Sequence, residues 1–234
     1  LFDNTFVNVG TMKNYGFEFD LNFRPVTTKD FSYDFNLIGS TMQNKFVSFS
    51  NYQFVGQDYY DEVGTSDPYS YYNLQRIEKD ESIGNFYMWR YAGHTEDGEW
   101  LVYDKSGDII RASQATADDR VKVGNGLPKF TLSSSQNFRY RNFDLSLFFR
   151  GAFGYDIFNI HDFYYANRNF TGNRLQKAYG KNFKISGNAN PVVCDYFLER
   201  GDYLKLDMIT LGYTLNLQKC RFIDRIRVYG TVKN

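Results

Sequence analysis

YGFEFDLNFR (residues 15–24) alternates apolar and polar side chains without a break. Phenylalanine and leucine occupy the odd positions from Phe17 to Phe23, while glutamate, aspartate, asparagine and arginine occupy the even ones. A period of two is typical of a β-strand with one face buried and the other exposed to water. A short turn around residues 25–30 follows and the alternation restarts over residues 31–37, so the two runs predict a hairpin of long strands.

The same unit recurs twice further along the chain. Four more runs share the alternation, and they cover residues 130–140, 143–153, 203–215 and 225–232. A tight turn is expected at residues 141–142, and Ser134 and Gln136 weaken an otherwise apolar face. Within the run 203–215 the apolar positions change parity, which predicts a β-bulge near Asp207-Met208.

The connections between these runs differ in length. Turns within hairpins are short, at residues 25–30, 141–142 and 216–224, whereas the hairpins are separated by loops of about 44–127 and 156–202 without obvious internal structure. Strands of about ten residues suit a tilted crossing of a bilayer, and short turns on one side with long loops on the other are typical of outer-membrane barrels. We therefore predict an all-β fold, an antiparallel transmembrane β-barrel with periplasmic turns and extracellular loops.

Six strands are too few to close such a barrel, and open edges in lipid would leave backbone groups without hydrogen-bond partners. We therefore expect the 234 residues to be part of a single, larger barrel domain. The polar strand residues are expected to face a hydrated lumen, and they include Glu18, Asp20, Asp34, Asp144 and Arg150.

Composition narrows the classes of function. Lysine plus arginine and aspartate plus glutamate both number 27, so the net charge is zero, and no basic stretch indicates a nucleic-acid partner. Aromatic residues make up 19% of the chain although its mean hydropathy is negative, which favours a chain with wet faces and an aromatic-rich lipid band. No run approaches the roughly 20 apolar residues of a membrane helix, and we expect the export signal to lie outside this sequence.

No sequence pattern indicates catalysis, a metal site or a cofactor. His94 and His161 lie far apart, no His/Cys spacing suits zinc, and the carboxylates are scattered, so neither an enzyme nor a cofactor is expected. Residues 104–108, with Asp118 and Asp119, have the oxygen-rich composition of a cation-binding loop. The lysine within the segment and the absence of a terminal glutamate favour a plain β-turn around Ser106-Gly107 instead.

Two cysteines are too few for a disulfide scaffold. Cys194 is expected in an outer loop and Cys220 in a periplasmic turn, at opposite ends of a strand that spans about 30–40 Å. A disulfide requires far closer Cα atoms, so these two thiols should not pair with each other.

Aromatic side chains gather in the first long loop and suggest a binding surface. The main candidates lie within residues 83–100 and are Tyr87, Trp89, Tyr91, Asp97 and Trp100. A second cluster comprises Tyr59 and Tyr60 with Tyr69, Tyr71 and Tyr72. Aromatic faces flanked by carboxylates suit sugar rings, which offer C–H faces and hydroxyl donors. The alternative is that these residues pack the loop on itself or against a partner.

Several motifs resemble, in order, those of SusC/RagA-type outer-membrane transporters. NVGTMKNYGFE (8–18) resembles the start of a barrel strand in that family, and GNGLPKF (124–130) resembles its G-x-x-x-P-K lead-in. NFDLS (142–146) and GYDIFN (154–159) are similar to another of its strands. The most specific match combines DYFLE, GDYLKL and LGYT within residues 195–214, followed by RVY and VKN within residues 227–234.

The resemblance implies a barrel of about 22 strands around an N-terminal plug, with this chain at about strands 16 to 21 and with the plug, TonB box and last strand elsewhere. It implies TonB-dependent active import of a large nutrient, most often an oligosaccharide and in some members a peptide. The implied partners are a SusD-like surface lipoprotein acting as a lid, the TonB complex and outer-membrane lipid. It also allows a dimer of transporter–lid pairs. The matched motifs are barrel motifs, so no binding residue carries over from the family.

Two alternatives remain open on the residues alone. A soluble, secreted, glycan-binding β-protein would also show alternating strands and aromatic loops, although long strands and unequal loops do not favour it. A barrel that secretes molecules or serves as a structural element would share the strand pattern. Detergent dependence separates the first alternative from a transporter, and a SusD-like partner argues against the second.

Overall fold

A computed structural model describes residues 10–49, 56–69, 72–179, 190–217 and 222–234. The chain divides into two compact units. The first, here called the sheet unit, comprises Tyr15–Gln43, Pro128–Gly154 and Gly201–Asn234. The second, here called the loop unit, comprises the described residues of Leu1–Asn14, Asn44–Leu127 and Tyr155–Arg200. No helix in the described part of the chain is both long enough and apolar enough to cross a membrane.

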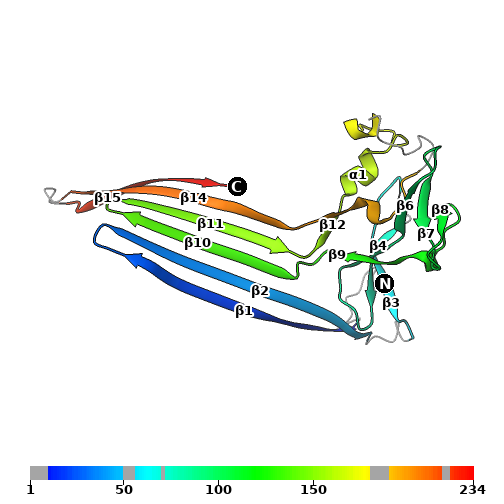
Figure 1. Cartoon of the computed structure of the whole chain (residues 1–234), viewed down its shortest axis with the longest axis horizontal. Coiled ribbons are helices and arrows are strands. Elements are labelled where there is room, and N and C mark those ends of the chain that lie inside the picture. Colours follow the sequence, from blue (N-terminus) through cyan, green and yellow to red (C-terminus); the bar gives the residue numbers. More distant parts are fainter. Residues whose placement is uncertain (1–9, 50–55, 70–71, 180–189, 218–221) are drawn as a thin grey trace, which may run out of the picture. The chain divides into compact units, whose positions relative to one another are not determined.

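Six long strands form one sheet in the order β1-β2-β10-β11-β14-β15, with sequence neighbours side by side (Figure 1). The strands are β1 (Gly10–Thr27), β2 (Phe31–Phe49), β10 (Phe130–Tyr140), β11 (Phe143–Phe153), β14 (Tyr203–Asn216) and β15 (Arg225–Lys233). The pairings from β2 through β15 are antiparallel. All six predicted strands are therefore confirmed, and the sheet is open at β1 and β15 within the described residues.

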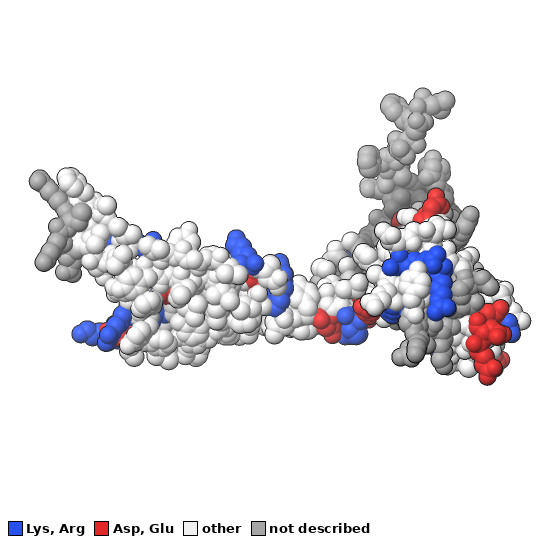
Figure 2. Space-filling view, turned by 90° about the horizontal axis from the view of Figure 1, so that it is seen from above, with Lys and Arg blue, Asp and Glu red and all other residues white. Residues whose placement is uncertain are grey.

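Cross-strand register sorts the side chains of the sheet unit into apolar and polar rows. One row runs from Tyr33 through Phe138 and Leu145 to Leu211, and the rings of Tyr33 and Phe138 stack with centroids 4.6 Å apart. The next row contains only polar residues, namely Asp34, Asn137, Ser146, Thr210 and Thr231. In Figure 2, most of the visible surface of the sheet unit consists of residues other than Lys, Arg, Asp and Glu. Such a sheet has one apolar and one wet face, as a barrel wall requires.

The polar residues that interrupt the apolar face form hydrogen bonds with their neighbours on the sheet. Gln136 donates from Nε2 to Ser134 Oγ at 2.7 Å and accepts a hydrogen bond from the Tyr33 hydroxyl. Ser134 Oγ in turn donates to the main-chain oxygen of Asn36 at 3.1 Å. A polar group that faces hydrocarbon without a hydrogen-bond partner would lower the folding stability by several kcal/mol. The internal hydrogen bonds explain how the face tolerates these residues.

The strand ends differ from the sequence-based expectations in two places. β1 continues to Thr27, so Pro25 lies inside the strand and not in the turn. A strand can include a proline at a position whose N–H makes no ladder hydrogen bond. β2 runs to Phe49, beyond the expected start of the loop at residue 44.

The other local predictions for the sheet unit are confirmed. The register of β11 and β14 shifts so that Phe148 pairs with Met208 and Phe149 with Leu206, which leaves Asp207 as the bulge residue. The β10–β11 turn contains Arg141 with φ of 51°, the left-handed conformation that tight hairpins favour.

The two long connections contain regular structure, contrary to the expectation of irregular loops. β3 (Tyr59–Gly64), β4 (Asn73–Glu78), β5 (Asn85–Met88) and β9 (Val121–Asn125) form a four-stranded sheet. β6 (Arg90–His94), β7 (Trp100–Tyr103) and β8 (Ile109–Arg111) form a three-stranded sheet, and β12 (Asp156–Phe158) pairs with β13 (Leu198–Arg200). The helices are α1 (Ile160–Tyr165) and the 3-10 turns η2 (Ala117–Asp119), η3 (Gln176–Tyr179) and η4 (Asp195–Phe197). Strands of three to six residues are too short to give a readable alternation in the sequence.

One hydrophobic core joins both connections in the loop unit. The first connection contributes Phe86, Met88 and Trp100, and the second contributes Phe163, Cys194 and Phe197. Trp89 and Cys194 form a parallel β-bridge, and Asp195 accepts the backbone N–H of Tyr91 at 2.7 Å. The two connections therefore fold as a single structure.

Cys194 is a free, fully buried thiol, and burial raises its pKa to about 12. Its free state agrees with the expectation that it does not pair with Cys220, which lies outside the described residues. A thiol of such high pKa has little thiolate at neutral pH and is chemically inert.

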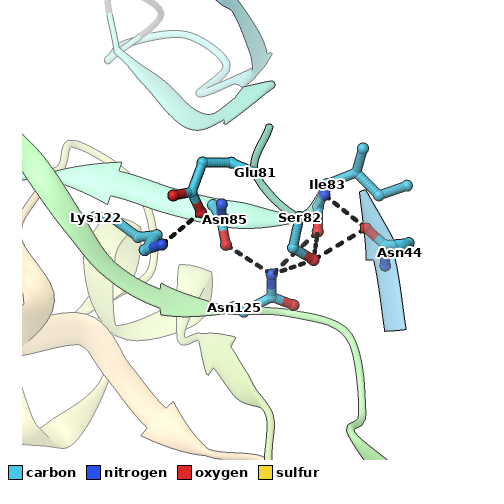
Figure 3. A network of polar contacts seen from close by, with 7 residues as sticks. All are labelled: Asn44, Glu81, Ser82, Ile83, Asn85, Lys122 and Asn125. Atoms are coloured by element: carbon cyan, nitrogen blue, oxygen red, sulfur yellow. Dashed lines mark hydrogen bonds and ion pairs between the residues drawn. The ribbon is translucent and has the colours of Figure 1, made fainter. Parts of the chain in front are cut away.

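A network of polar contacts fixes the turn between β4 and β5 (Figure 3). Asn125 donates from Nδ2 to the main-chain oxygen of Ile83 at 3.0 Å and to Asn85 Oδ1 at 2.8 Å. On the other side of the turn, Asn44 Oδ1 accepts the N–H of Ile83 at 2.7 Å and the hydroxyl of Ser82 at 2.9 Å. The network anchors one end of the four-stranded sheet through side chains from β2 and β9.

Asn125→Ala is expected to destabilise this turn by about 1–3 kcal/mol, because the buried Asn85 Oδ1 and the Ile83 carbonyl lose their shared donor. Hydrogen exchange of the Ser82–Gly84 amides in the full-length protein measures the effect. Asn190→Ala is the matched control, since Asn190 is exposed and its side chain accepts a long hydrogen bond, 3.4 Å from Asn169. Equal exchange rates in the two variants would contradict the assigned role.

Candidate functional site

The four-stranded sheet of the loop unit has one core face and one polar, aromatic face. Phe86 and Met88 lie on the core face and are buried. On the other face, Asp61 pairs with Arg76 across β3 and β4, and Arg76 pairs with Asn85 across β4 and β5. Tyr59 and Tyr87 lie two positions from Asp61 and Asn85, so the alternation of strands places them on this same face. We call Tyr59, Asp61, Arg76 and Tyr87, together with Arg120, the tyrosine–arginine cluster.

Arg76 lies between two tyrosine rings at the centre of this cluster. Its guanidinium carbon is 3.7 Å from the ring centroid of Tyr59 and 3.8 Å from that of Tyr87. Asp61 accepts from Nε at 2.7 Å and from Nη2 at 3.2 Å, a two-point ion pair. Burial disfavours the charge, but the hydrogen bonds and charge of Asp61 outweigh it and raise the pKa of Arg76. The cluster is therefore a preorganised cationic stack.

Arg120 directly precedes β9 and adds a second guanidinium to the cluster. Its Nη2 donates to the main-chain oxygens of Asn73 and Tyr87, both at 2.5 Å, and its charge lies 5.8 Å from the Tyr87 ring centroid. Burial and the neighbouring charge of Arg76 lower its pKa. In the part of the chain that the structure describes, no carboxylate forms an ion pair with Arg120.

The structure places the predicted binding residues in different surroundings. Trp100 is 3% exposed and packs against Tyr91, Tyr196 and Phe197, with the Tyr91 ring 6.0 Å away. Trp89 is partly buried and donates from Nε1 to the Thr116 carbonyl at 2.9 Å. For Trp100 and Tyr91 this geometry matches the alternative that the loop packs on itself.

The remaining predicted residues are more accessible. Tyr59 and Tyr60 are 49% and 41% exposed but lie on opposite faces of β3, because neighbouring side chains of a strand alternate. Asp97 lies in the exposed turn between β6 and β7. In the second cluster Tyr69 is buried and Tyr72 contacts Trp89 edge-on, while Tyr71 lies outside the described residues.

In the tyrosine–arginine cluster, the sequence predicted Tyr59 and Tyr87 as binding residues but did not indicate the three charged side chains. Asp61, Arg76 and Arg120 belong to no motif and are separated by long stretches of sequence. The one available signal was the spacing of Tyr59 and Asp61, which puts an aromatic ring and a carboxylate on one face of a strand.

The sheet unit carries a polar groove of about 870 Å³ on its wet face. Arg227 binds Asp144 through Nε at 2.9 Å and Nη2 at 2.5 Å within it. Gly212 makes room for this pair, since a Cβ atom there would lie 2.6 Å from the oxygens of Asp144. The groove fits the expectation that polar strand residues face water.

The weak cation-loop pattern is a turn in the structure. Gly107 donates its N–H to the Asp104 carbonyl at 3.1 Å, and Asp108 donates its N–H to the Asp104 carboxylate at 2.8 Å. Asp119 accepts from the N–H groups of Lys105 and Thr116, and these bonds lower its pKa. Among the described residues, no three His, Cys, Asp or Glu side chains gather as a metal site would require.

The chain is similar to curated TonB-dependent receptors, although no family model matches it. It is 28% identical over 249 residues to the TonB-dependent receptor SusC of Bacteroides thetaiotaomicron, an alignment that covers 97% of this chain and 23% of SusC. It is 29% identical over 164 residues to the TonB-dependent receptor P3 of Formosa agariphila, which covers 65% of this chain and 16% of that receptor. The chain thus spans less than a quarter of the length of either relative.

Solved structures with the same fold include the RagAB peptide transporter. The match has a TM-score of 0.75 with 22% identity, and it covers 97% of this chain and 26% of that one. The RagAB peptide importer in its open-open state matches with a TM-score of 0.72. Nearly the whole chain, including both units, therefore follows the fold of part of an outer-membrane barrel.

Proposed function

We propose that this chain, a SusC/RagA-like portion of a TonB-dependent transporter of the bacterial outer membrane, takes part in the active import of an oligosaccharide. The observation that carries the proposal is the half-exposed Tyr59 ring on a polar face of the loop unit. A flat aromatic face beside charged donors and acceptors suits a sugar ring, which stacks through its C–H face and hydrogen bonds through its hydroxyls.

The proposed topology follows from the connections. The loop unit faces the outside of the cell, the short turns face the periplasm, and the polar rows of the sheet unit line a hydrated lumen. A SusD-like lipoprotein covers the extracellular mouth, and the TonB complex supplies energy through parts of the protein outside these residues. The single-barrel organisation of residues 1–234 is part of this proposal.

A peptide is the second candidate substrate. The structural neighbour RagAB is named a peptide transporter, and the arginines of the tyrosine–arginine cluster would also suit the carboxylates of a peptide. The names of the relatives describe receptors and importers, which favours import over secretion or a purely structural role.

Tyr59→Ala is expected to weaken oligosaccharide binding about fivefold, because one stacking contact contributes on the order of 1 kcal/mol. Calorimetry with the full-length transporter purified with its lid, against panels of oligosaccharides and mixed peptides, measures it. Tyr179→Ala is the matched control, since Tyr179 is 61% exposed in the loop unit and lies outside the cluster. Binding of peptides alone, unaffected by Tyr59→Ala, would favour the second candidate.

A further inference from the structure

The ring of Tyr59 has one covered face and one open side. The guanidinium carbon of Arg76 lies 3.7 Å from the ring centroid and covers one face, yet the tyrosine is 49% exposed. Asp61 holds Arg76 through two hydrogen bonds, so the stack fixes the ring before any ligand arrives. A side chain that is already ordered loses less conformational entropy on binding.

Glu78 lies next to the open side of this ring. Tyr59 and Glu78 are direct partners across β3 and β4. Lys79 donates its N–H to the Asp58 carbonyl at 3.0 Å, so the next pair, Tyr59 and Glu78, is a non-hydrogen-bonded pair. The Cβ atoms of such a pair are about 4.5–5.5 Å apart and point to the same face of the sheet. Arg76 lies two residues before Glu78, so Glu78 is on the side of the ring that Arg76 leaves open.

The carboxylate of Glu78 is available to a ligand. Glu78 is exposed, and in the part of the chain that the structure describes its side chain makes no hydrogen bond or ion pair. The neighbouring charges are engaged elsewhere, since Asp80 and Glu81 each bind a lysine, at 2.9 and 2.5 Å. The positive charge of Lys79 acts on Asp80. A ligand beside the Tyr59 ring therefore meets a negative charge and two acceptor oxygens.

An aromatic face beside a carboxylate defines the kind of sugar that fits. The C–H face of a sugar ring stacks on the tyrosine. Two adjacent hydroxyl groups of the same ring can donate to the two carboxylate oxygens, and hydrogen bonds to a charged acceptor are stronger than those between neutral groups. A sugar that carries its own carboxylate would be repelled by Glu78. The two side chains together therefore favour a neutral sugar.

We propose that Tyr59 and Glu78 form a subsite for a neutral sugar residue that presents two adjacent hydroxyl groups. This inference rests on the proposed function and narrows its substrate class to neutral oligosaccharides. The sugar ring stacks on the open side of Tyr59, and its hydroxyls donate to the Glu78 carboxylate. Arg76, oriented by Asp61, holds the tyrosine ring in place from the other face.

The test is calorimetry on the full-length transporter purified with its lid. The probes are the neutral trisaccharides maltotriose, cellotriose, mannotriose and xylotriose, together with trigalacturonic acid. The wild type is expected to bind at least one neutral probe, and to bind it more tightly than the acid. Glu78→Gln should weaken that binding about tenfold or more, as the loss of a charged acceptor predicts. The control Glu62→Gln changes an exposed glutamate on the opposite face of β3 and should leave binding unchanged.

Glu78→Lys gives a test of opposite sign. It replaces the negative charge by a positive one, so binding of trigalacturonic acid should rise several-fold while binding of the neutral probe falls. A misfolded variant would not gain affinity, so the rise separates a direct contact from a structural effect. Affinity for the acid that Glu78→Lys leaves unchanged overturns the inference.

The double variant Tyr59→Ala/Glu78→Gln tests whether both side chains hold one sugar residue. Its loss of affinity should be smaller than the product of the two single losses, because side chains that share a ligand group are coupled. Losses that multiply without coupling would place the two side chains on different sugar residues and overturn the subsite.

Two further outcomes separate this inference from the proposed function. Neutral binding that Tyr59→Ala weakens and Glu78→Gln leaves unchanged overturns the subsite but keeps oligosaccharide import, as does tighter binding of trigalacturonic acid than of every neutral probe. Binding of mixed peptides by a transporter that binds no saccharide overturns both.

Discussion

Trp100→Ala is expected to unfold the core of the loop unit, at a cost of about 3–5 kcal/mol. The indole is 3% exposed and lies 5.4 Å from the ring of Tyr196 and 5.5 Å from that of Phe197. These contacts join the first long connection to the second. The cavity would therefore loosen both connections together, and any loss of ligand binding would follow from misfolding.

Limited proteolysis and hydrogen exchange of the full-length transporter in detergent measure this effect. Faster cleavage is expected in both connections, including residues 195–200, which lie far from position 100 in sequence. Ile109→Ala is the control, because Ile109 is 55% exposed in β8 and surface truncations cost little. Protection of residues 195–200 that survives Trp100→Ala would show that the two connections do not share one core.

Leu211→Arg is expected to destabilise the folded barrel by about 2–4 kcal/mol if the residue lies near the middle of the bilayer. Leu211 is 55% exposed in β14 and belongs to the apolar row with Leu145. In the proposed topology, that row is the lipid-facing side of the barrel wall. A guanidinium there must leave water or distort the surrounding lipid.

Thr210→Arg is the matched control for this prediction. Thr210 is the preceding residue of the same strand, and it lies in the polar row between Ser146 and Thr231. In the proposed topology its side chain faces the lumen, so the charge stays hydrated and little stability should be lost. Refolding of the full-length protein into lipid vesicles across a denaturant series measures both variants. Equal losses at the two positions would contradict the assignment of faces.

The candidate site was only partly readable from the sequence. Tyr59, Tyr60 and Tyr87 were predicted as binding residues and are accessible in the loop unit, where their role stays a prediction. Trp100 and Tyr91 drew the same prediction, yet they pack into or against the core. Composition cannot separate the two groups, because an aromatic ring suits a hydrophobic core as well as a sugar.

The sequence by itself determined the six long strands, the turn at residues 141–142 and the bulge at Asp207. These features depend on local backbone geometry, since a period of two places alternate side chains on opposite faces whatever the strand pairs with. The same alternation, with unequal connections, led to the barrel that the comparisons support.

Only the tertiary structure decided the organisation of the loop unit. Its strands have three to six residues, too few for a pattern, and its core depends on contacts such as that of Tyr91 with Asp195, 104 positions apart. The tyrosine–arginine cluster forms in the same way, from residues on β3, β4 and β5 and just before β9. Such contacts depend on how the chain closes long loops and buries its aromatic side chains, which no local pattern encodes.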